Sequence, residues 1–234
     1  MSFRILALAF LLITATLSID QFTAVANEDQ NESAAMERDT GESAAPCIVG
    51  HTAPPVGFWT WPANTRVNIY LREPDFSESD VSAVRVAVQN WDTTATENGS
   101  NVRFIFHGLT RETRIAQGEM TIIRKAVYDK KQRQRALFEA HSLQRDGFID
   151  YALMLVDPSV RNPGMLTNVV AHELGHGLGL LDCNQCDSRS TAMGLLKAGN
   201  ESNGIEGPTP CDQREVMAVY EGLKPRSPLV AVFE

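Results

Sequence analysis

The sequence predicts an α+β fold, because it contains two kinds of apolar pattern, one typical of strands and the other typical of helices. Short stretches of about five residues alternate between apolar and polar side chains, which is typical of strands with one buried face. Longer stretches place apolar residues at intervals of three and four, which is typical of helices with one buried face. Residues 46–234 number 189, which suits one domain with a proper core, and no internal repeat is visible.

The first half of this domain predicts a strand, a helix and two further strands. Residues 67–71 alternate and predict the first strand. Ser77 is placed to cap a helix whose first turn is acidic. The apolar positions of this helix keep helical spacing: Val81, Val84, Val88 and Trp91. Residues 102–106 and 120–123 predict the next two strands.

Residues 124–147 are charged and difficult to assign to an element. Over residues 133–141 we expect a short helix. The basic side chains of this stretch are expected to form a solvated loop face, although a patch that steers substrate or a site of self-cleavage is the alternative. They are Arg124, Lys125, Lys130, Lys131, Arg133 and Arg135.

The remainder of the domain predicts one more strand and two helices. Residues 148–156 are apolar enough for a buried strand. A helix is expected to start near Thr167. Thr209 and Pro210 predict the beginning of a last helix, which runs to about Gly222, because proline suits the first helical turn.

The most informative segment is VAHELGHGLGLLDC, which spans residues 170–183. His172 and His176 are four residues apart, so on a helix they project from one face, one turn apart. Two imidazoles in that arrangement can bind one metal ion. Gly179 and Asp182 complete the pattern HExxHxxGxxD. The pattern predicts a catalytic zinc site with three protein ligands rather than a structural site.

A catalytic zinc needs three protein ligands and an open position for water. A straight helix supplies only His172 and His176, so the third ligand must follow a turn of the chain. Gly179 can adopt the left-handed conformation that ends a helix, and Asp182 can then return toward the metal. Glu173 is expected to reach the metal only through a water, whose proton it can take as general base and later return to a leaving amine.

A bare HExxH match can also arise by chance on an exposed, charged helix. In this chain the same helix has a predicted apolar face, formed by Leu166, Val169, Val170, Leu174 and Leu178. A competing class of zinc proteases takes its third ligand from a downstream ExxxD. No glutamate after His176 has an aspartate at the fourth following position, which disfavours that class.

On these residues the chain resembles the metzincin clan of zinc endopeptidases, whose signature is HExxHxxGxx followed by His or Asp. The Asp182 variant resembles the snapalysin group of small secreted bacterial proteases, and the order of elements resembles the matrixin layout. Only residues 170–194 carry the specific part of the resemblance.

The resemblance implies a metzincin-like fold, with a twisted mixed β-sheet, a metal-binding active-site helix, a Met-turn and a C-terminal helix. It also implies that Met193 forms a hydrophobic floor under the metal and is not a ligand. Leu195 stands where some metzincins have a tyrosine, so no tyrosine is assigned there.

The first 26 residues predict a secretory signal peptide that is cut after Ala26. An uncleaved anchor is the alternative, although the apolar run over residues 5–17 is short for a membrane span. Residues 27–45 carry six acidic side chains and one basic side chain, so we expect a disordered leader or short pro-segment. The zinc metalloprotease catalytic domain is then expected at 46–234, secreted and soluble.

Four cysteines lie after the predicted signal peptide, and an even number in an oxidising compartment predicts two disulfides. We favour Cys183–Cys186 with Cys47–Cys211, because the first two are close in a turn. Such bonds would hold the loop after Asp182. Two alternatives remain open: a second, structural zinc bound by the four thiols, and a latency role in which the Cys47 thiolate occupies the open zinc position.

These observations predict a secreted zinc endopeptidase with one catalytic Zn²⁺ and a peptide or protein as substrate. The alternatives are a non-catalytic binding domain on the same scaffold and a zinc amidase that acts on cell-wall peptides. The net charge is −8, and residues 27–45 carry −5 of it, so nothing indicates nucleic acid. We expect a monomer with no membrane partner in its mature form, and no motif marks a structural Ca²⁺ site.

Overall fold

A computed structural model of the chain describes residues 59–127, 135–143, 147–187, 189–195 and 204–223. The predicted signal peptide (1–26) and acidic leader (27–45) lie outside these residues, as does Cys47. Among the described helices, none has the length and apolar character that a membrane crossing requires.

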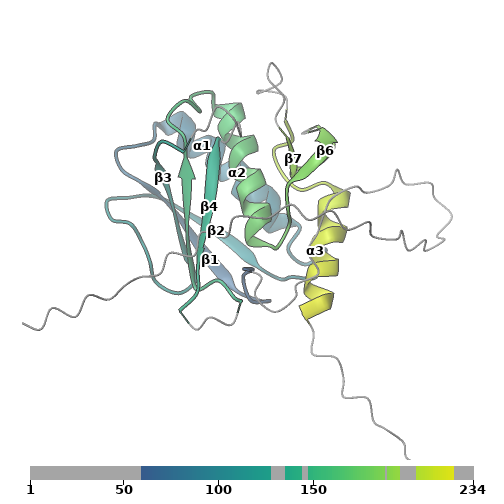
Figure 1. Cartoon of the computed structure of the whole chain (residues 1–234). Helices are drawn as coiled ribbons and strands as arrows, with labels where there is room; N and C mark the ends of the chain where they lie inside the picture. Colours follow the sequence, from purple (N-terminus) through teal and green to yellow (C-terminus); the bar gives the residue numbers. More distant parts are fainter. Residues whose placement is uncertain (1–58, 128–134, 144–146, 188, 196–203, 224–234) are drawn as a thin grey trace, which may run out of the picture. The chain divides into compact units, whose positions relative to one another are not determined.

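The described residues form a five-stranded mixed sheet in the order β2-β1-β3-β5-β4 (Figure 1). The strands are β1 (Arg66–Arg72), β2 (Arg103–Thr110), β3 (Glu119–Arg124), β4 (Ala136–His141) and β5 (Tyr151–Val156). β1 pairs in parallel with β2 and β3, and β3 pairs in parallel with β5. β4 runs antiparallel to β5 at one edge. The predicted α+β class and mixed sheet are confirmed.

Three helices lie in the described part of the chain: α1 (Glu78–Thr93), α2 (Pro163–Gly177) and α3 (Pro210–Leu223). Ser77 caps α1 as predicted, and Asp80 completes a capping box with it. α2 begins four residues before the predicted start at Thr167, because Asn162 caps it and Pro163 fits its first turn. α3 closely matches the last predicted helix.

The expected helix over residues 133–141 is wrong, because the described part of this stretch forms strand β4. Its side chains alternate between two faces. The Phe138 ring reaches the end of α2 at Gly177, whereas His141 stacks on Tyr151 of β5 with ring centroids 4.5 Å apart. Every residue of β4 pairs with a residue of β5. This non-local pairing decides the conformation, and the local charge pattern does not encode it.

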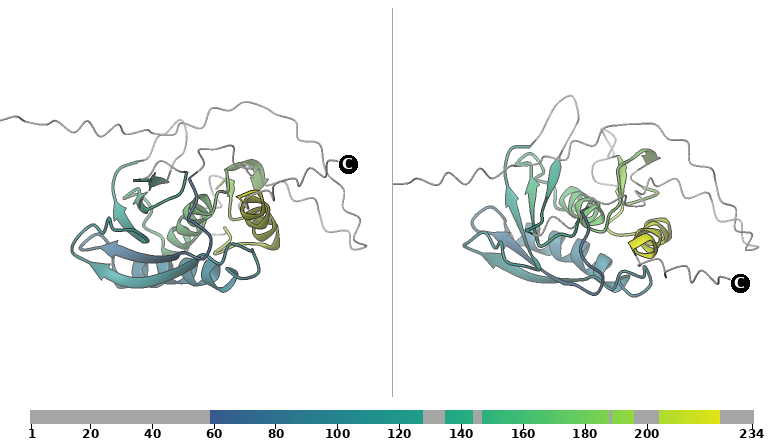
Figure 2. Two further views of the ribbon diagram at one scale, coloured as in Figure 1. Left: turned by 90° about the horizontal axis from the view of Figure 1, so that it is seen from below. Right: turned by 60° about the horizontal axis from the view of Figure 1, so that its bottom comes forward.

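α1 and α2 cover the same face of the sheet and pack against each other (Figure 2). The indole N–H of Trp91 donates to the carbonyl of Ala171 at 2.8 Å. The hydroxyl of Thr167 donates to the carbonyl of Ala83 at 3.2 Å. Trp91 is fully buried. Because Ala171 directly precedes His172, α1 fixes the backbone where the metal-binding motif begins.

In Figures 1 and 2, α2 lies between the sheet and α3. Tyr220 ties α3 to the segment before β1: its hydroxyl donates to the Trp61 carbonyl at 2.7 Å and lies 2.9 Å from Thr60 Oγ1. The backbone N–H of Trp61 donates in turn to the carbonyl of Gly177 at 3.1 Å. The segment before β1 therefore closes the C-terminal end of α2. A short two-stranded pair, β6 (Cys183–Asp187) and β7 (Gly194–Leu195), follows α2.

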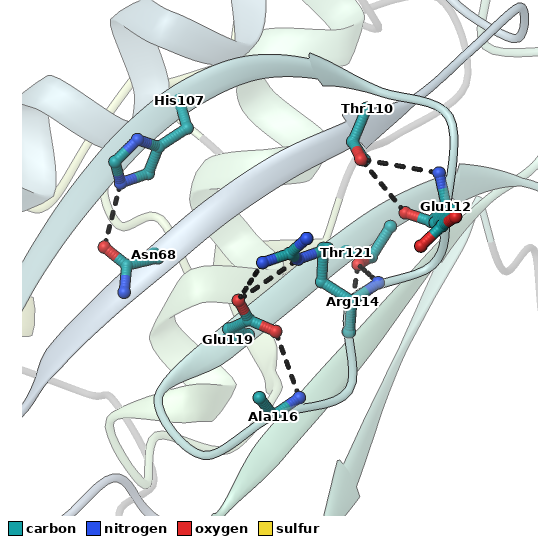
Figure 3. Close-up of polar contacts among 8 residues, drawn as sticks. All are labelled: Asn68, His107, Thr110, Glu112, Arg114, Ala116, Glu119 and Thr121. Atoms are coloured by element: carbon teal, nitrogen blue, oxygen red, sulfur yellow. Dashed lines mark hydrogen bonds and ion pairs between the residues drawn. The ribbon is translucent and has the colours of Figure 1, made fainter.

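On the face of the sheet turned away from the helices, the loop between β2 and β3 folds over its own strands (Figure 3). Arg114 donates from Nε and Nη2 to Glu119 Oε1 at 3.2 and 3.1 Å. Its backbone N–H donates to Thr121 Oγ1 at 2.8 Å. Its guanidinium also lies over the ring of Tyr70, which stacks on His107. These groups satisfy one another locally, on the side of the sheet opposite α2.

We predict that Trp91→Phe lowers the free energy of unfolding by about 2 kcal/mol, because it removes the donor to the Ala171 carbonyl and opens space in the core. Urea unfolding followed by circular dichroism measures the loss. Val86→Ala is the control, since Val86 lies on α1 with 37% of its surface exposed. Surface changes usually stay within about 0.5 kcal/mol. Equal losses in the two variants would contradict the role of Trp91.

Candidate metal centre

The two motif histidines project from one face of α2, as their spacing predicts. The rings of His172 and His176 meet edge to face, with centroids 4.8 Å apart and planes at 90°. The residues expected to form an apolar face on the same helix are all buried: Leu166, Val169, Val170, Leu174 and Leu178. The motif therefore lies on a buried helix and not on the exposed, charged helix expected of a chance match.

Asp182 returns to the histidines after the helix ends. Its Oδ1 lies 2.9 Å from Nε2 of His172 and 3.5 Å from Nε2 of His176. A tetrahedral zinc with bonds of about 2.0–2.1 Å holds its ligand atoms roughly 3.3 Å apart, so these two distances fit such a site. The Asp182 side chain is 52% exposed, so the site faces solvent.

A backbone carbonyl holds the second nitrogen of each imidazole. Nδ1 of His172 donates to the carbonyl of Ala192 at 2.9 Å, and Nδ1 of His176 donates to the carbonyl of Leu180 at 2.8 Å. Bonds of this kind fix the orientation of the ring and leave the Nε2 lone pair available to a metal. Both Nε2 atoms are thus directed to the place where the Asp182 carboxylate lies.

Gly179 makes the reversal between the histidines and the aspartate possible. Its φ is +88°, in the left-handed region that glycine reaches at little cost, which confirms the predicted helix end. A Cβ at this position would also lie 2.9 Å from Cγ1 of Val219 on α3. The N–H of Leu180 then donates back to the carbonyl of Gly175 at 3.1 Å and closes the turn.

Glu173 lies beside the histidines but is buried, with 6% of its surface exposed. Its carboxylate and the ligand nitrogens of His172 and His176 all lie within 4.8 Å of one another. Asp182 Oδ1, at 2.9 and 3.5 Å from the two Nε2 atoms, has a spacing that fits zinc, and its assignment as the third ligand stays a prediction. Burial raises the pKa of Glu173, while the two imidazoles and the backbone N–H of Phe138 on β4 oppose the shift.

Attraction between these groups sets their protonation when no metal is bound. Burial by itself would lower the pKa of His176, but the hydrogen bond to Asp182 and the charges of Glu173 and Asp182 raise it to about 9. Burial would raise the pKa of Asp182, but hydrogen bonds from the two imidazoles hold it well below its ordinary value. His176 must therefore lose a proton before a metal can bind its Nε2.

Met193 is fully buried against α2. A Cβ on Gly175 would lie 2.4 Å from Met193 Sδ, and a Cβ on Gly177 would lie 3.0 Å from Trp61 Nε1. The two glycines flank His176 and let other segments approach the helix closely on both sides. Met193 thus lies beside the helix turn that carries His176. Its assignment as a Met-turn residue stays a prediction from the resemblance.

Cys183 and Cys186 form the disulfide that the sequence favours directly after Asp182. This bond uses two of the four thiols that a structural zinc would need, so it contradicts that alternative. Cys211 is also disulfide-bonded. The expected Cys47–Cys211 pairing and the latency role of Cys47 involve a cysteine outside the described residues and stay predictions.

Sequence reasoning misses the buried carboxylate of Asp212 at the start of α3. It accepts hydrogen bonds from the N–H and hydroxyl of Thr209, the N–H of Ala192 and the hydroxyl of Thr191. Ala192 also accepts from His172, so Asp212 fixes the loop that supports a histidine of the site. The only sequence signal is the cap-like spacing of Thr209 and Asp212, which predicts a helix start but no tertiary contact.

No family model and no curated protein match the chain. Among solved structures, it is similar to metalloproteinase-II from Bacteroides fragilis, with 14% identity and a TM-score of 0.41 over 75% of this chain and 59% of that one. It is also similar to archaemetzincin from Methanopyrus kandleri, with 11% identity and a TM-score of 0.40 over 69% of this chain and 96% of that one. The chain thus spans less than two thirds of the Bacteroides protein. Both similarities are low, and the chemistry of the site rests on the chain's own residues.

We predict that zinc affinity rises about tenfold per pH unit between about pH 7 and 9, because the His176 proton must leave on binding. Above about pH 9 the metal-free site has already lost that proton, so the affinity levels off. Calorimetric titration in buffers of different ionisation enthalpy counts the protons released. Binding near pH 7.5 without proton release would contradict the assigned charge state.

We predict that Gly179→Ala lowers zinc affinity at least about tenfold, because alanine is strained at this φ and its Cβ would clash with Val219. Zinc affinity is measured by competition with a chelator. Gly108→Ala is the matched control, since Gly108 has φ +86° but a Cβ there meets nothing within 4 Å. It should lose stability without losing zinc affinity. An equal loss of affinity in both variants would argue against the role of Gly179.

Proposed function

We propose that the chain is a secreted zinc-dependent endopeptidase. The observation that carries the proposal is the convergence of His172, His176 and Asp182, with Oδ1 of the aspartate 2.9 and 3.5 Å from the two Nε2 atoms. Three protein ligands around a solvent-facing position are typical of a catalytic zinc, whereas structural zinc sites have four. Secretion rests on the signal peptide predicted at residues 1–26.

In this proposal, His172 and His176 bind zinc through their neutral Nε2 atoms, and Asp182 binds through Oδ1. Zinc, when bound, lowers the pKa of a water and polarises the carbonyl of the scissile peptide bond. The carbonyls of Ala192 and Leu180 hold the two rings in place, so the site is preorganised. The exposed side of Asp182 leaves room for a substrate carbonyl to approach.

Glu173 is the general base of the proposed reaction and afterwards its general acid. It takes the proton of the attacking water and returns it to the leaving amine. The environment of its carboxylate supports this role, because burial raises its pKa and so makes it a stronger base, while the nearby N–H of Phe138 on β4 favours its charged form. Its distance from the imidazoles leaves it free to act on water.

We propose that the peptide substrate lies extended along β4, an edge strand of the described sheet. The carbonyl of Arg135 accepts from the N–H of Asp157 at 2.9 Å, so in this register the odd-numbered residues bond to β5. The even-numbered residues turn their backbone groups outward, where an extended peptide can pair with them; at Phe138 only the carbonyl remains for such pairing, because its N–H faces Glu173. Because Phe138 contacts Glu173, a peptide on this edge passes directly beside the proposed base.

We predict that Glu173→Gln retains one zinc per chain and the wild-type fold, but cleaves casein at least about a thousandfold more slowly, because no carboxylate is left to take the proton. Zinc content, circular dichroism and casein cleavage are measured on the same preparation. Glu221→Gln, an exposed residue on α3, is the matched control and should cleave at the wild-type rate. Undiminished cleavage by the Glu173 variant would remove this residue from the mechanism.

The same assays separate the proposal from its alternatives. A chelator should abolish casein cleavage by the wild-type protein, and added zinc should restore it. Zinc binding without cleavage of any peptide would favour a non-catalytic binding domain. Cleavage of peptidoglycan peptides but not of casein or gelatin would favour a cell-wall amidase.

A further inference from the structure

Asp212 is a buried carboxylate with no cationic partner among the described residues. It is 0% exposed at the start of α3. The Ala192 N–H and the Thr209 N–H and hydroxyl donate to its Oδ2 at 3.0, 2.8 and 2.7 Å, and the hydroxyl of Thr191 donates to its Oδ1. A buried carboxylate without a counter-ion is costly, and capping α3 uses only the bonds to Thr209. The bonds to Thr191 and Ala192 lead elsewhere.

They lead to the metal site through one peptide group. The Met193 N–H donates to Thr191 Oγ1 at 3.1 Å. The carbonyl of the same peptide group, that of Ala192, accepts from Nδ1 of His172 at 2.9 Å. The chain of hydrogen bonds therefore runs from the imidazole through this peptide group and the Thr191 hydroxyl to Asp212.

Each hydrogen bond in this series has only one possible donor. The Met193 N–H can only donate, so Thr191 Oγ1 accepts there and gives its own proton to the carboxylate. The Ala192 carbonyl can only accept, so Nδ1 of His172 must carry the proton. Aligned donors polarise one another, and the negative charge at the end of the row strengthens every bond in it.

The two histidines differ in this respect. The Nδ1 proton of His176 goes to the Leu180 carbonyl, within the turn that follows α2. Among the described residues, the series of hydrogen bonds that begins at His172 continues to a buried carboxylate, that of Asp212. The side chains of the two histidines are about equally exposed, at 19% and 25%. Unequal access of solvent therefore would not by itself make their Nδ1 protons behave differently.

We propose that Asp212 is a positioning residue for His172, acting through Thr191 and the peptide group between Ala192 and Met193. This series of hydrogen bonds from His172 to Asp212, called the relay below, fixes the Nδ1–H form of the His172 ring and restrains its orientation. It also increases the electron density that Nε2 offers to a metal. This inference rests on the proposed function, since it assigns the relay to a zinc ligand. It adds that the two histidines are unequal, with His172 the more strongly supported.

The test is a pair of matched threonine variants. Thr191→Val keeps the shape of the side chain but breaks the relay, and we expect zinc affinity to fall about 10- to 100-fold. Thr191→Ser restores the hydroxyl and should bind zinc within about threefold of wild type. Thr209→Val removes a hydroxyl that also contacts Asp212 but lies outside the relay. It should lower the melting temperature and leave zinc affinity unchanged.

A second readout follows each histidine separately. In the zinc-loaded protein with ¹⁵N-labelled histidine, the Nδ1 proton of His172 should exchange with water more slowly than that of His176. Thr191→Val should accelerate exchange at His172 alone. The wild-type comparison needs no variant, so the proposal can be tested even if Thr191→Val does not fold.

The outcomes separate this inference from the function on which it rests. A wild-type protein that binds no zinc overturns both. A protein that binds zinc and cleaves casein, but in which Thr191→Val and Thr209→Val have the same affinity, overturns the relay alone. Equal exchange of the two Nδ1 protons in the wild type also overturns the relay and leaves the proposed peptidase intact.

Discussion

The approach of one Asp182 oxygen to two imidazole nitrogens is the constraint on which the rest of the site depends. Because Oδ1 lies 2.9 and 3.5 Å from the Nε2 atoms, the chain must reverse as soon as α2 ends. Gly179 allows this with a φ of +88°. The same turn places the Leu180 carbonyl against Nδ1 of His176. A single backbone reversal therefore positions one candidate ligand and orients another.

The reversal alone would not hold the imidazoles, because a helix end frays unless tertiary contacts restrain it. In this protein α2 is restrained by three separate segments. The indole N–H of Trp91 on α1 donates to the carbonyl of Ala171, just before the motif. Met193 packs against Gly175, and the backbone N–H of Trp61 donates to the carbonyl of Gly177. Glycines at the two positions beside His176 permit that close approach.

The parts that the sequence predicts well are those decided by neighbours in the chain. Helix geometry and the glycine at position 179 are enough to predict that Asp182 returns to His172 and His176. The structure brings these three side chains together. β4 is mispredicted because its conformation comes from pairing with β5, and the residue that links it to the site, Phe138, has no local signature. Asp212 is missed for the same reason, since its spacing from Thr209 indicates only a helix cap.

Burial explains how two carboxylates beside the same histidines can have different duties. Asp182 is about half exposed, and hydrogen bonds from both imidazoles hold its pKa low, so it stays charged and suits a cation. Glu173 is one residue from His172 but enclosed between α2 and β4, and burial raises its pKa. Environments that move two acids in opposite directions are how proteins separate a permanently charged group from one that exchanges protons. In the proposed reaction this difference in enclosure assigns the metal to Asp182 and the proton to Glu173.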